Sequence, residues 1–128
     1  MALYLDASAA VKLLIDEAES DALWAYVDGP LRTSSALLRT ELVRAATRLD
    51  ARRVGIARVL LGSFTLREID NEVLDRAGEM APHTLRTLDA IHIATASLLG
   101  PDLEAVVTYD RRMIEAARLY GLPVASPA

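Results

Sequence analysis

Residues 3–8 read Leu-Tyr-Leu-Asp-Ala-Ser, a short apolar run that ends on a carboxylate and leads directly into a helical segment. The apolar residues predict a buried strand. An oxygen of Asp6 or Ser8 can cap the following helix, because a side-chain oxygen there accepts a hydrogen bond from an unpaired backbone amide. Capping is a sufficient explanation for Asp6 unless other carboxylates reach the same place.

Composition restricts the class of protein. The 128 residues are 52% hydrophobic and 25% charged, which is typical of one globular domain spanning residues 1–128. The chain contains no cysteine, which excludes disulfides, thiolate zinc sites and a cysteine nucleophile. The first strand follows Met1 almost at once, and no apolar run approaches the roughly 18 residues of a membrane span. We expect a cytoplasmic protein that is neither secreted nor membrane-spanning.

Charge is unevenly distributed along the chain. The formal net charge is −4, yet residues 32–67 carry eight arginines against two acidic residues. Arginine binds phosphate and carboxylate groups through a planar fork of donors. This stretch is either a solvated helical surface or a patch that binds an anionic partner.

Strand and helix patterns alternate along the whole sequence. Strands are expected at residues 3–5, 31–34, 64–69, 105–108 and 122–125, and helices at 7–15, 22–27, 36–52, 54–61, 70–80, 88–99 and 111–120. This order predicts an α/β domain whose mainly parallel sheet lies between helical layers. Ligands bind such sheets at the carboxyl ends of the strands, where the strand order reverses.

Two aspartates follow predicted strands directly. Asp6 ends the strand at 3–5, and Asp110 closely follows the strand at 105–108. If these strands are neighbours, both carboxylates lie in one crevice at the same edge of the sheet.

Two further carboxylates lie on predicted helices. Glu41 is at the edge of an apolar stripe on the helix at 36–52, so it can face a crevice without entering the core. That stripe consists of Leu38, Leu42, Ala45 and Leu49. Asp89 is in the first turn of the helix at 88–99, where a carboxylate is also favoured by the helix dipole.

Clustered carboxylates repel one another and favour a bound cation. Mg²⁺ prefers oxygen ligands at about 2.1 Å. Two such ions about 3.5 to 4 Å apart can activate a water and stabilise the leaving oxygen of a phosphodiester.

Four segments resemble, in order and spacing, the PIN domain, and within it the VapC toxins of bacterial type II toxin-antitoxin modules. They are Leu5-Asp6-Ala7-Ser8, Thr40-Glu41-Leu42, the run Leu88-Asp89-Ala90-Ile91-His92-Ile93-Ala94-Thr95-Ala96, and Thr108-Tyr109-Asp110-Arg111-Arg112. The resemblance implies a three-layer α/β/α fold with parallel strand order 3-2-1-4-5. It also implies an endoribonuclease that depends on one or two Mg²⁺ or Mn²⁺ ions, forms a homodimer and is inhibited by a VapB-type antitoxin.

The resemblance also implies a set of site residues. The catalytic and metal-binding residues are Asp6, Glu41, Asp89 and Asp110, with Ser8 and Thr108 as supporting hydroxyls. The implied mechanism has Asp6, Asp89 and Asp110 holding the metal, while Glu41 is a further ligand or the base that orients the attacking water.

Other interpretations remain open at this point. A metal-free ribonuclease could use His83 and His92 as acid and base, although His92 is better explained as a structural hydrogen-bonding partner on the helix that carries Asp89. A non-catalytic module that binds RNA or protein could retain the same scaffold. The arginine-rich stretch could contact an RNA backbone through Arg44 and Arg48, or could support dimer and antitoxin contacts.

Overall fold

Strands and helices alternate from the first residues onward in the computed structural model, which describes residues 1–128. The strands are β1 (Ala2–Leu5), β2 (Leu31–Ser35), β3 (Thr65–Arg67), β4 (Leu103–Val107) and β5 (Val124–Ala125). The α-helices are α1 (Ala7–Leu14), α2 (Ser20–Val27), α3 (Leu38–Leu49), α4 (Val54–Leu61), α5 (Asn71–Gly78), α6 (Thr87–Ser97) and α7 (Arg111–Leu119). Two short 3₁₀-helices, η1 (Ala51–Arg53) and η2 (Gly100–Asp102), complete the list.

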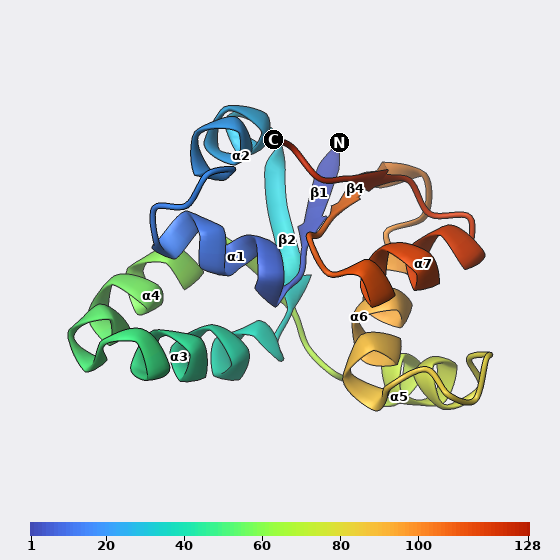
Figure 1. The fold of residues 1–128 in the computed structure, drawn as a ribbon. Helices are drawn as coiled ribbons and strands as arrows, with labels where there is room; N and C mark the ends of the chain where they lie inside the picture. The colour runs from blue at the N-terminus through green and yellow to red at the C-terminus, as the bar shows by residue number, and fades with distance from the viewer.

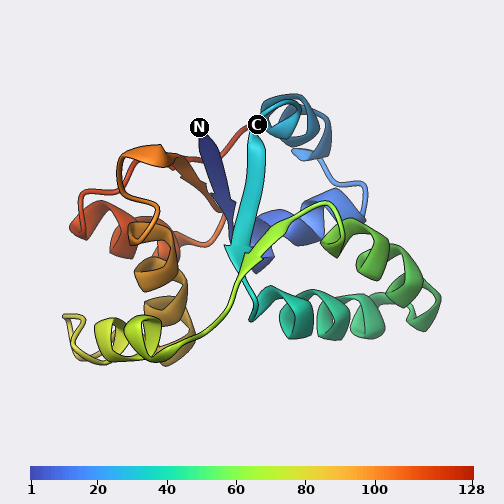
Figure 2. The same cartoon turned by 180° about the vertical axis from the view of Figure 1, so that it is seen from behind.

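The five strands form one parallel sheet in the order β3-β2-β1-β4-β5. Helices α1 to α4 lie on one face of the sheet and α5 to α7 on the other (Figure 1), and the view from behind shows the same division (Figure 2). The predicted three-layer α/β/α fold and its strand order are therefore confirmed.

Strand β1 contributes to the core on both faces of the sheet. Successive side chains of a strand point to opposite faces, so Leu3 and Leu5 pack with α1 to α4 while Tyr4 packs with α6 and α7. All three side chains are essentially inaccessible to solvent. Burial on both faces explains why residues 2–5 are apolar without alternation.

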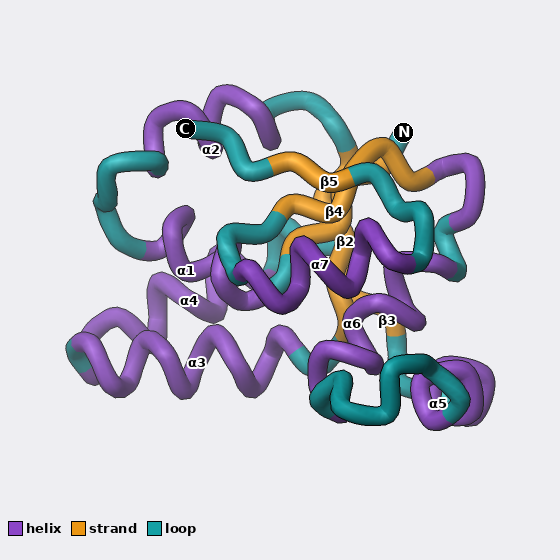
Figure 3. The backbone as a smooth tube through the Cα atoms, turned by 45° about the vertical axis from the view of Figure 1, so that its right-hand side comes forward, coloured by secondary structure: helices purple, strands orange, loops and turns teal.

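The central position of β1 determines which residues meet at the edge of the sheet. β1 pairs with β4 so that Leu5 lies opposite Val107, and the amide of Asp6 donates to the carbonyl of Val107. Asp6 and Thr108 therefore leave the sheet side by side. Figure 3 shows helices α1, α6 and α7 around these strands.

Some predicted boundaries and one core residue differ from the structure. The strand at 64–69 is only Thr65–Arg67, and the helix at 36–52 is only Leu38–Leu49. Leu49, predicted as part of the buried stripe, is 51% exposed. It lies in the last turn of α3, just before η1, where about half of the residue is exposed to solvent.

No helix of the protein is both long enough and apolar enough to cross a bilayer.

Candidate active site

Asp6 is a buried carboxylate held by three donors. It caps α1, because its Oδ1 accepts a hydrogen bond from the amide of Ala9 at 3.1 Å. Oδ1 also accepts from the Ser8 hydroxyl at 2.6 Å, and Oδ2 accepts from the Thr108 hydroxyl at 2.6 Å. The side chain is only 4% exposed. Capping is thus correct but incomplete, since Asp6 also links β1 to the end of β4.

Burial is the main electrostatic influence on Asp6. It raises the pKa of the Asp6 carboxyl, because a low-dielectric surrounding disfavours the charged form. The hydrogen bonds from Ser8 and Thr108 oppose this rise, since they stabilise the carboxylate. The two hydroxyls therefore act as electrostatic support for an ionised Asp6.

The same hydroxyls position Asp110. The Thr108 hydroxyl accepts a hydrogen bond from the Asp110 amide at 3.1 Å, and the Ser8 hydroxyl accepts from the Tyr109 amide at 2.9 Å. Asp110 then caps α7, where its Oδ1 accepts from the amide of Arg112 at 2.9 Å. Its own backbone is thus fixed beside Asp6 while its side chain remains half-buried.

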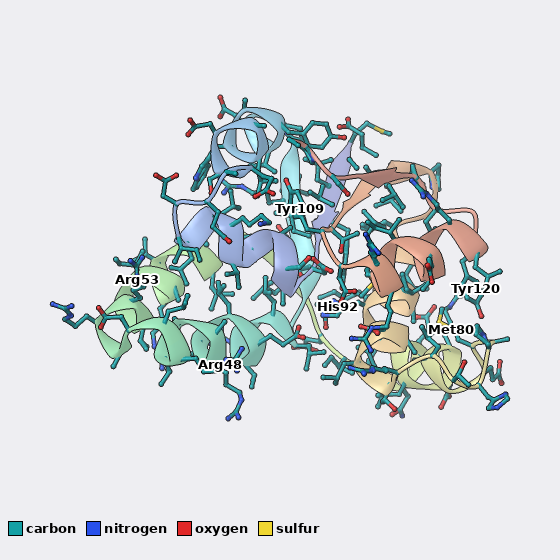
Figure 4. All side chains as sticks on the ribbon, in the orientation of Figure 1. Arg48, Arg53, Met80, His92, Tyr109 and Tyr120 are labelled. Atoms are coloured by element: carbon teal, nitrogen blue, oxygen red, sulfur yellow. The ribbon has the colours of Figure 1, made fainter.

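Glu41 is held from across the fold by a buried histidine. Glu41 Oε1 lies 2.7 Å from His92 Nε2, and His92 Nδ1 lies 2.7 Å from the Tyr4 hydroxyl. His92 is 2% exposed and Tyr4 is 1% exposed. Figure 4 shows His92 on α6 in the middle of the molecule, between the two sets of helices. A proton on Nε2 faces Glu41 whether the ring is neutral or charged, because only a donor suits an ionised carboxylate.

Asp89 is half-buried in the first turn of α6. Burial raises the pKa of its carboxyl, and the nearby negative charge of Asp110 raises it further. Arg86 and Arg112 oppose this rise to a smaller extent. Asp89 and Asp110 are therefore close enough to repel each other, as expected of carboxylates that share a site.

The four carboxylates surround one region. Hydrogen bonds join Asp6 to the segment that carries Asp110, and Asp110 interacts with Asp89 by repulsion. His92 is bonded to Glu41, and its ring is near enough to Asp6 and Asp89 to interact electrostatically with both carboxyl groups. No three of these side chains are arranged as a set that could hold a metal ion. The donors are nevertheless all carboxylate oxygens, which suits Mg²⁺ or Mn²⁺ in chemical type.

A groove between α1 and α3 opens beside this region. It encloses about 660 Å³, and we call it the α1/α3 groove after its lining, which includes Ser8, Glu41, Arg44, Arg48 and Tyr109. Arg44 and Arg48 are exposed, and neither makes an ion pair. Both guanidinium groups are therefore available to an anionic ligand in the groove.

The pairing of His92 with Glu41 and Tyr4 is the feature that sequence reasoning missed. His92 was expected to hydrogen bond within its own helix, but its partners come from β1 and α3. The available signal was a polar ring in a helix that is apolar on nearly all sides, because a buried imidazole requires partners. His83 is exposed and lines a separate hollow beside α5, so the structure does not bring the two histidines together.

Comparison with known proteins identifies the family of the chain. The family model of the PIN domain matches residues 3–119. Ribonuclease VapC46 of Mycobacterium tuberculosis is 49% identical, with 99% of this chain and 98% of that protein covered. Ribonucleases VapC47 and VapC35 of the same species are 37% and 38% identical, each with 98% of this chain and 96% of the relative covered. The match to the family model and these full-length similarities show that the chain belongs to the PIN-domain family and is related along its whole length to the VapC ribonucleases.

Proposed function

We propose that this protein is a VapC-type toxin, a metal-dependent endoribonuclease that acts in the cytoplasm and is inhibited by a cognate VapB-type antitoxin. The observation that carries the proposal is that Asp6 and the segment of Asp110 leave β1 and β4 side by side, with Asp89 near enough to Asp110 to repel it, beside an arginine-lined groove. The full-length similarity to proteins named ribonucleases supports the same reaction class.

The residues proposed to hold Mg²⁺ or Mn²⁺ are Asp6, Asp89 and Asp110, with Glu41 as a further ligand or as a base. Such a cation supplies a Lewis acid for the phosphate and lowers the pKa of the attacking water. Repulsion between Asp89 and Asp110 supports this assignment, because two adjacent carboxylates gain most from a shared cation.

The protein's own residues orient the reacting groups. Ser8 and Thr108 hold both oxygens of Asp6 in one orientation, and His92 holds one oxygen of Glu41. The second oxygen of Glu41 makes no hydrogen bond within the protein, so in this proposal it accepts a proton from the attacking water. Attack by water on the phosphorus, with the ribose 3′-oxygen as the leaving group that takes up a proton, leaves a 5′-phosphate and a 3′-hydroxyl. No 2′,3′-cyclic phosphate forms, because the 2′-hydroxyl is not the nucleophile.

An RNA-cleavage assay with added Mn²⁺ tests the reaction. The wild-type protein should cleave RNA, lose activity on chelation, and give 5′-phosphate ends. Asp6→Asn should abolish cleavage because a metal-binding charge is lost. Asp70→Asn is the matched control, since Asp70 caps α5 through the amide of Val73 and lies outside the site. Ends with 2′,3′-cyclic phosphate would contradict the mechanism.

The alternative is a non-catalytic module that binds RNA or protein. Two observations favour it. Asp6, Glu41 and Asp110 each accept hydrogen bonds from groups within the protein, and no three acidic or histidine side chains are placed to hold a metal ion together. RNA binding without any cleavage in Mn²⁺ would support this alternative.

We also propose the assembly that VapC-type proteins imply, a homodimer bound by its antitoxin. Expression with and without the protein encoded next to it should show growth arrest and RNA cleavage only when the neighbour is missing. Light scattering of the isolated toxin should give twice the chain mass. A monomer would contradict the dimer without affecting the proposed reaction.

A further inference from the structure

A second groove begins on the other side of the carboxylates. It encloses about 590 Å³ between the start of α6 and helix α7, and we call it the α6/α7 groove. Its lining includes Leu85, Arg86, Asp89, Arg112, Glu115 and Leu119. Leu88 lines the α1/α3 groove and the next residue, Asp89, lines this one. The two grooves therefore adjoin at the first turn of α6, where the candidate active site lies.

Two unpaired arginines flank the inner end of this groove. Arg86 directly precedes α6 and Arg112 is in the first turn of α7. Both are exposed, neither makes an ion pair, and both act electrostatically on Asp89, which lines the same groove. Guanidinium groups in this arrangement suit a phosphate through paired hydrogen bonds.

The outer part of the groove has a different chemistry. Leu85 and Leu119 provide apolar surface, and Glu115 lies one turn beyond Arg112 on α7. A carboxylate there repels phosphate but accepts hydrogen bonds from the amino group of a base. The volume is within the range of pockets that hold small ligands. The groove thus combines an anion site at its inner end with a site for a flat, partly apolar group further out.

We infer that the α6/α7 groove is a second RNA subsite, which binds the nucleotide next to the scissile phosphate on the side opposite to the α1/α3 groove. Its phosphate lies between Arg86 and Arg112, and its base contacts Leu85 and Leu119. This inference rests on the proposed function. It specifies the substrate as single-stranded RNA that extends on both sides of the cleaved bond, because an open groove binds an unpaired base more readily than a duplex.

The test uses RNA oligonucleotides shortened stepwise from either end of a mapped cleavage site. The variant Arg86→Gln/Arg112→Gln is compared with Arg44→Gln/Arg48→Gln. The control is Arg111→Gln/Arg118→Gln, which removes two exposed arginines of α7 that line neither groove. Each variant is measured for kcat/KM on every oligonucleotide, and for RNA affinity against salt in the Asp6→Asn background.

The inference predicts an end-specific effect. Wild-type protein and the control should lose kcat/KM when either end is shortened, whereas Arg86→Gln/Arg112→Gln should become insensitive to shortening from one end only. Loss of two phosphate contacts should also reduce the slope of log affinity against log salt by about 1.4. A weaker metal site caused by altered charge near Asp89 would instead slow all oligonucleotides equally.

Other outcomes overturn the inference in distinguishable ways. If Arg86→Gln/Arg112→Gln behaves like the control while the wild type cleaves RNA, the subsite is wrong and the proposed function stands. The same holds if the variant cleaves normally but resists the antitoxin, since the groove is then a protein-binding site. If the wild type neither cleaves nor binds RNA, the proposed function fails and the subsite fails with it.

Discussion

At the scale of single residues, the Thr108 hydroxyl is, with that of Ser8, one of the groups that favour the ionised form of Asp6. Burial raises the pKa of Asp6 and the Thr108 hydrogen bond lowers it. Thr108→Val removes that bond and an acceptor for the Asp110 amide, so the pKa of Asp6 should rise further. Because the proposed mechanism requires an ionised Asp6, the acid limb of the profile of kcat/KM against pH should move to higher pH.

Thr108→Ser is the matched control, since it keeps the hydroxyl and removes only a methyl group. Thr108→Ser should retain the wild-type pH profile. Thr108→Val should in addition lose about 1 to 3 kcal/mol of unfolding free energy, because the Asp6 carboxylate and the Asp110 amide each lose a hydrogen-bond partner. Urea unfolding and the pH profile measure the two effects separately. An unchanged acid limb in Thr108→Val would remove the electrostatic role of Thr108.

His92 provides a second test at this scale. His92→Gln should lower kcat about 10- to 100-fold, as is typical when the group that orients an active-site ligand is lost. KM should change little, because His92 is buried and does not reach the grooves. Ser97→Ala is the control, since Ser97 is a partly buried polar residue of the same helix whose hydroxyl donates to the carbonyl of Ala94. Equal losses of kcat in both variants would reduce His92 to a structural role.

The sequence predicted the strand-end aspartates better than the partners of Glu41. A residue that closely follows a parallel strand lies at the carboxyl edge of the sheet, so the sequence alone assigns Asp6 and Asp110 to one edge. A helical wheel gives only the face on which Glu41 lies. Its partner His92 is 51 residues away, and that contact depends on how α3 and α6 approach across the edge of the sheet.

At the scale of elements, α3 carries both Glu41 and the proposed RNA contacts Arg44 and Arg48. Arg44→Gln/Arg48→Gln should reduce the slope of log RNA affinity against log salt by about 1.4, because two phosphate contacts are lost. Arg39→Gln, on the first turns of the same helix but outside the α1/α3 groove, should leave that slope unchanged. Fluorescence anisotropy across a salt series measures both. An identical slope in all three proteins would exclude this face of α3 from RNA binding.

Helices differ in how well their burial can be predicted. The interior of α6 is buried from Ala90 to Ala96, which agrees with a sequence that is apolar on nearly every side of this helix. In α3 the apolar stripe of helical periodicity predicts that Leu49 is buried, but Leu49 is exposed. Periodicity reports which residues share a face, whereas burial of the last turn depends on where the neighbouring element ends.

At the scale of the whole molecule, composition and alternation predicted the α/β class but not the strand order. Hydrophobicity does not determine which strands neighbour β1, since β2 and β4 both contain buried residues. The order 3-2-1-4-5 came from the resemblance of four short motifs to a known family, and the pairing of β1 with both β2 and β4 confirms it.

Cation binding should appear as a gain in stability of the whole molecule. If the proposed cation site is correct, a divalent cation binds the folded state preferentially, because only folding brings these carboxylates near one another. At 100 times its dissociation constant it should add about 2.7 kcal/mol to the free energy of unfolding.

Asp89→Asn/Asp110→Asn should lose this gain. The metal-free variant should remain at least as stable as the wild type, because the mutual repulsion of the two carboxylates is removed and asparagine also caps helices well. Thermal unfolding with increasing Mn²⁺ measures the effect, with Asp70→Asn as the capping control. An equal Mn²⁺-dependent shift in the double variant and the wild type would place the cation elsewhere and favour the non-catalytic module.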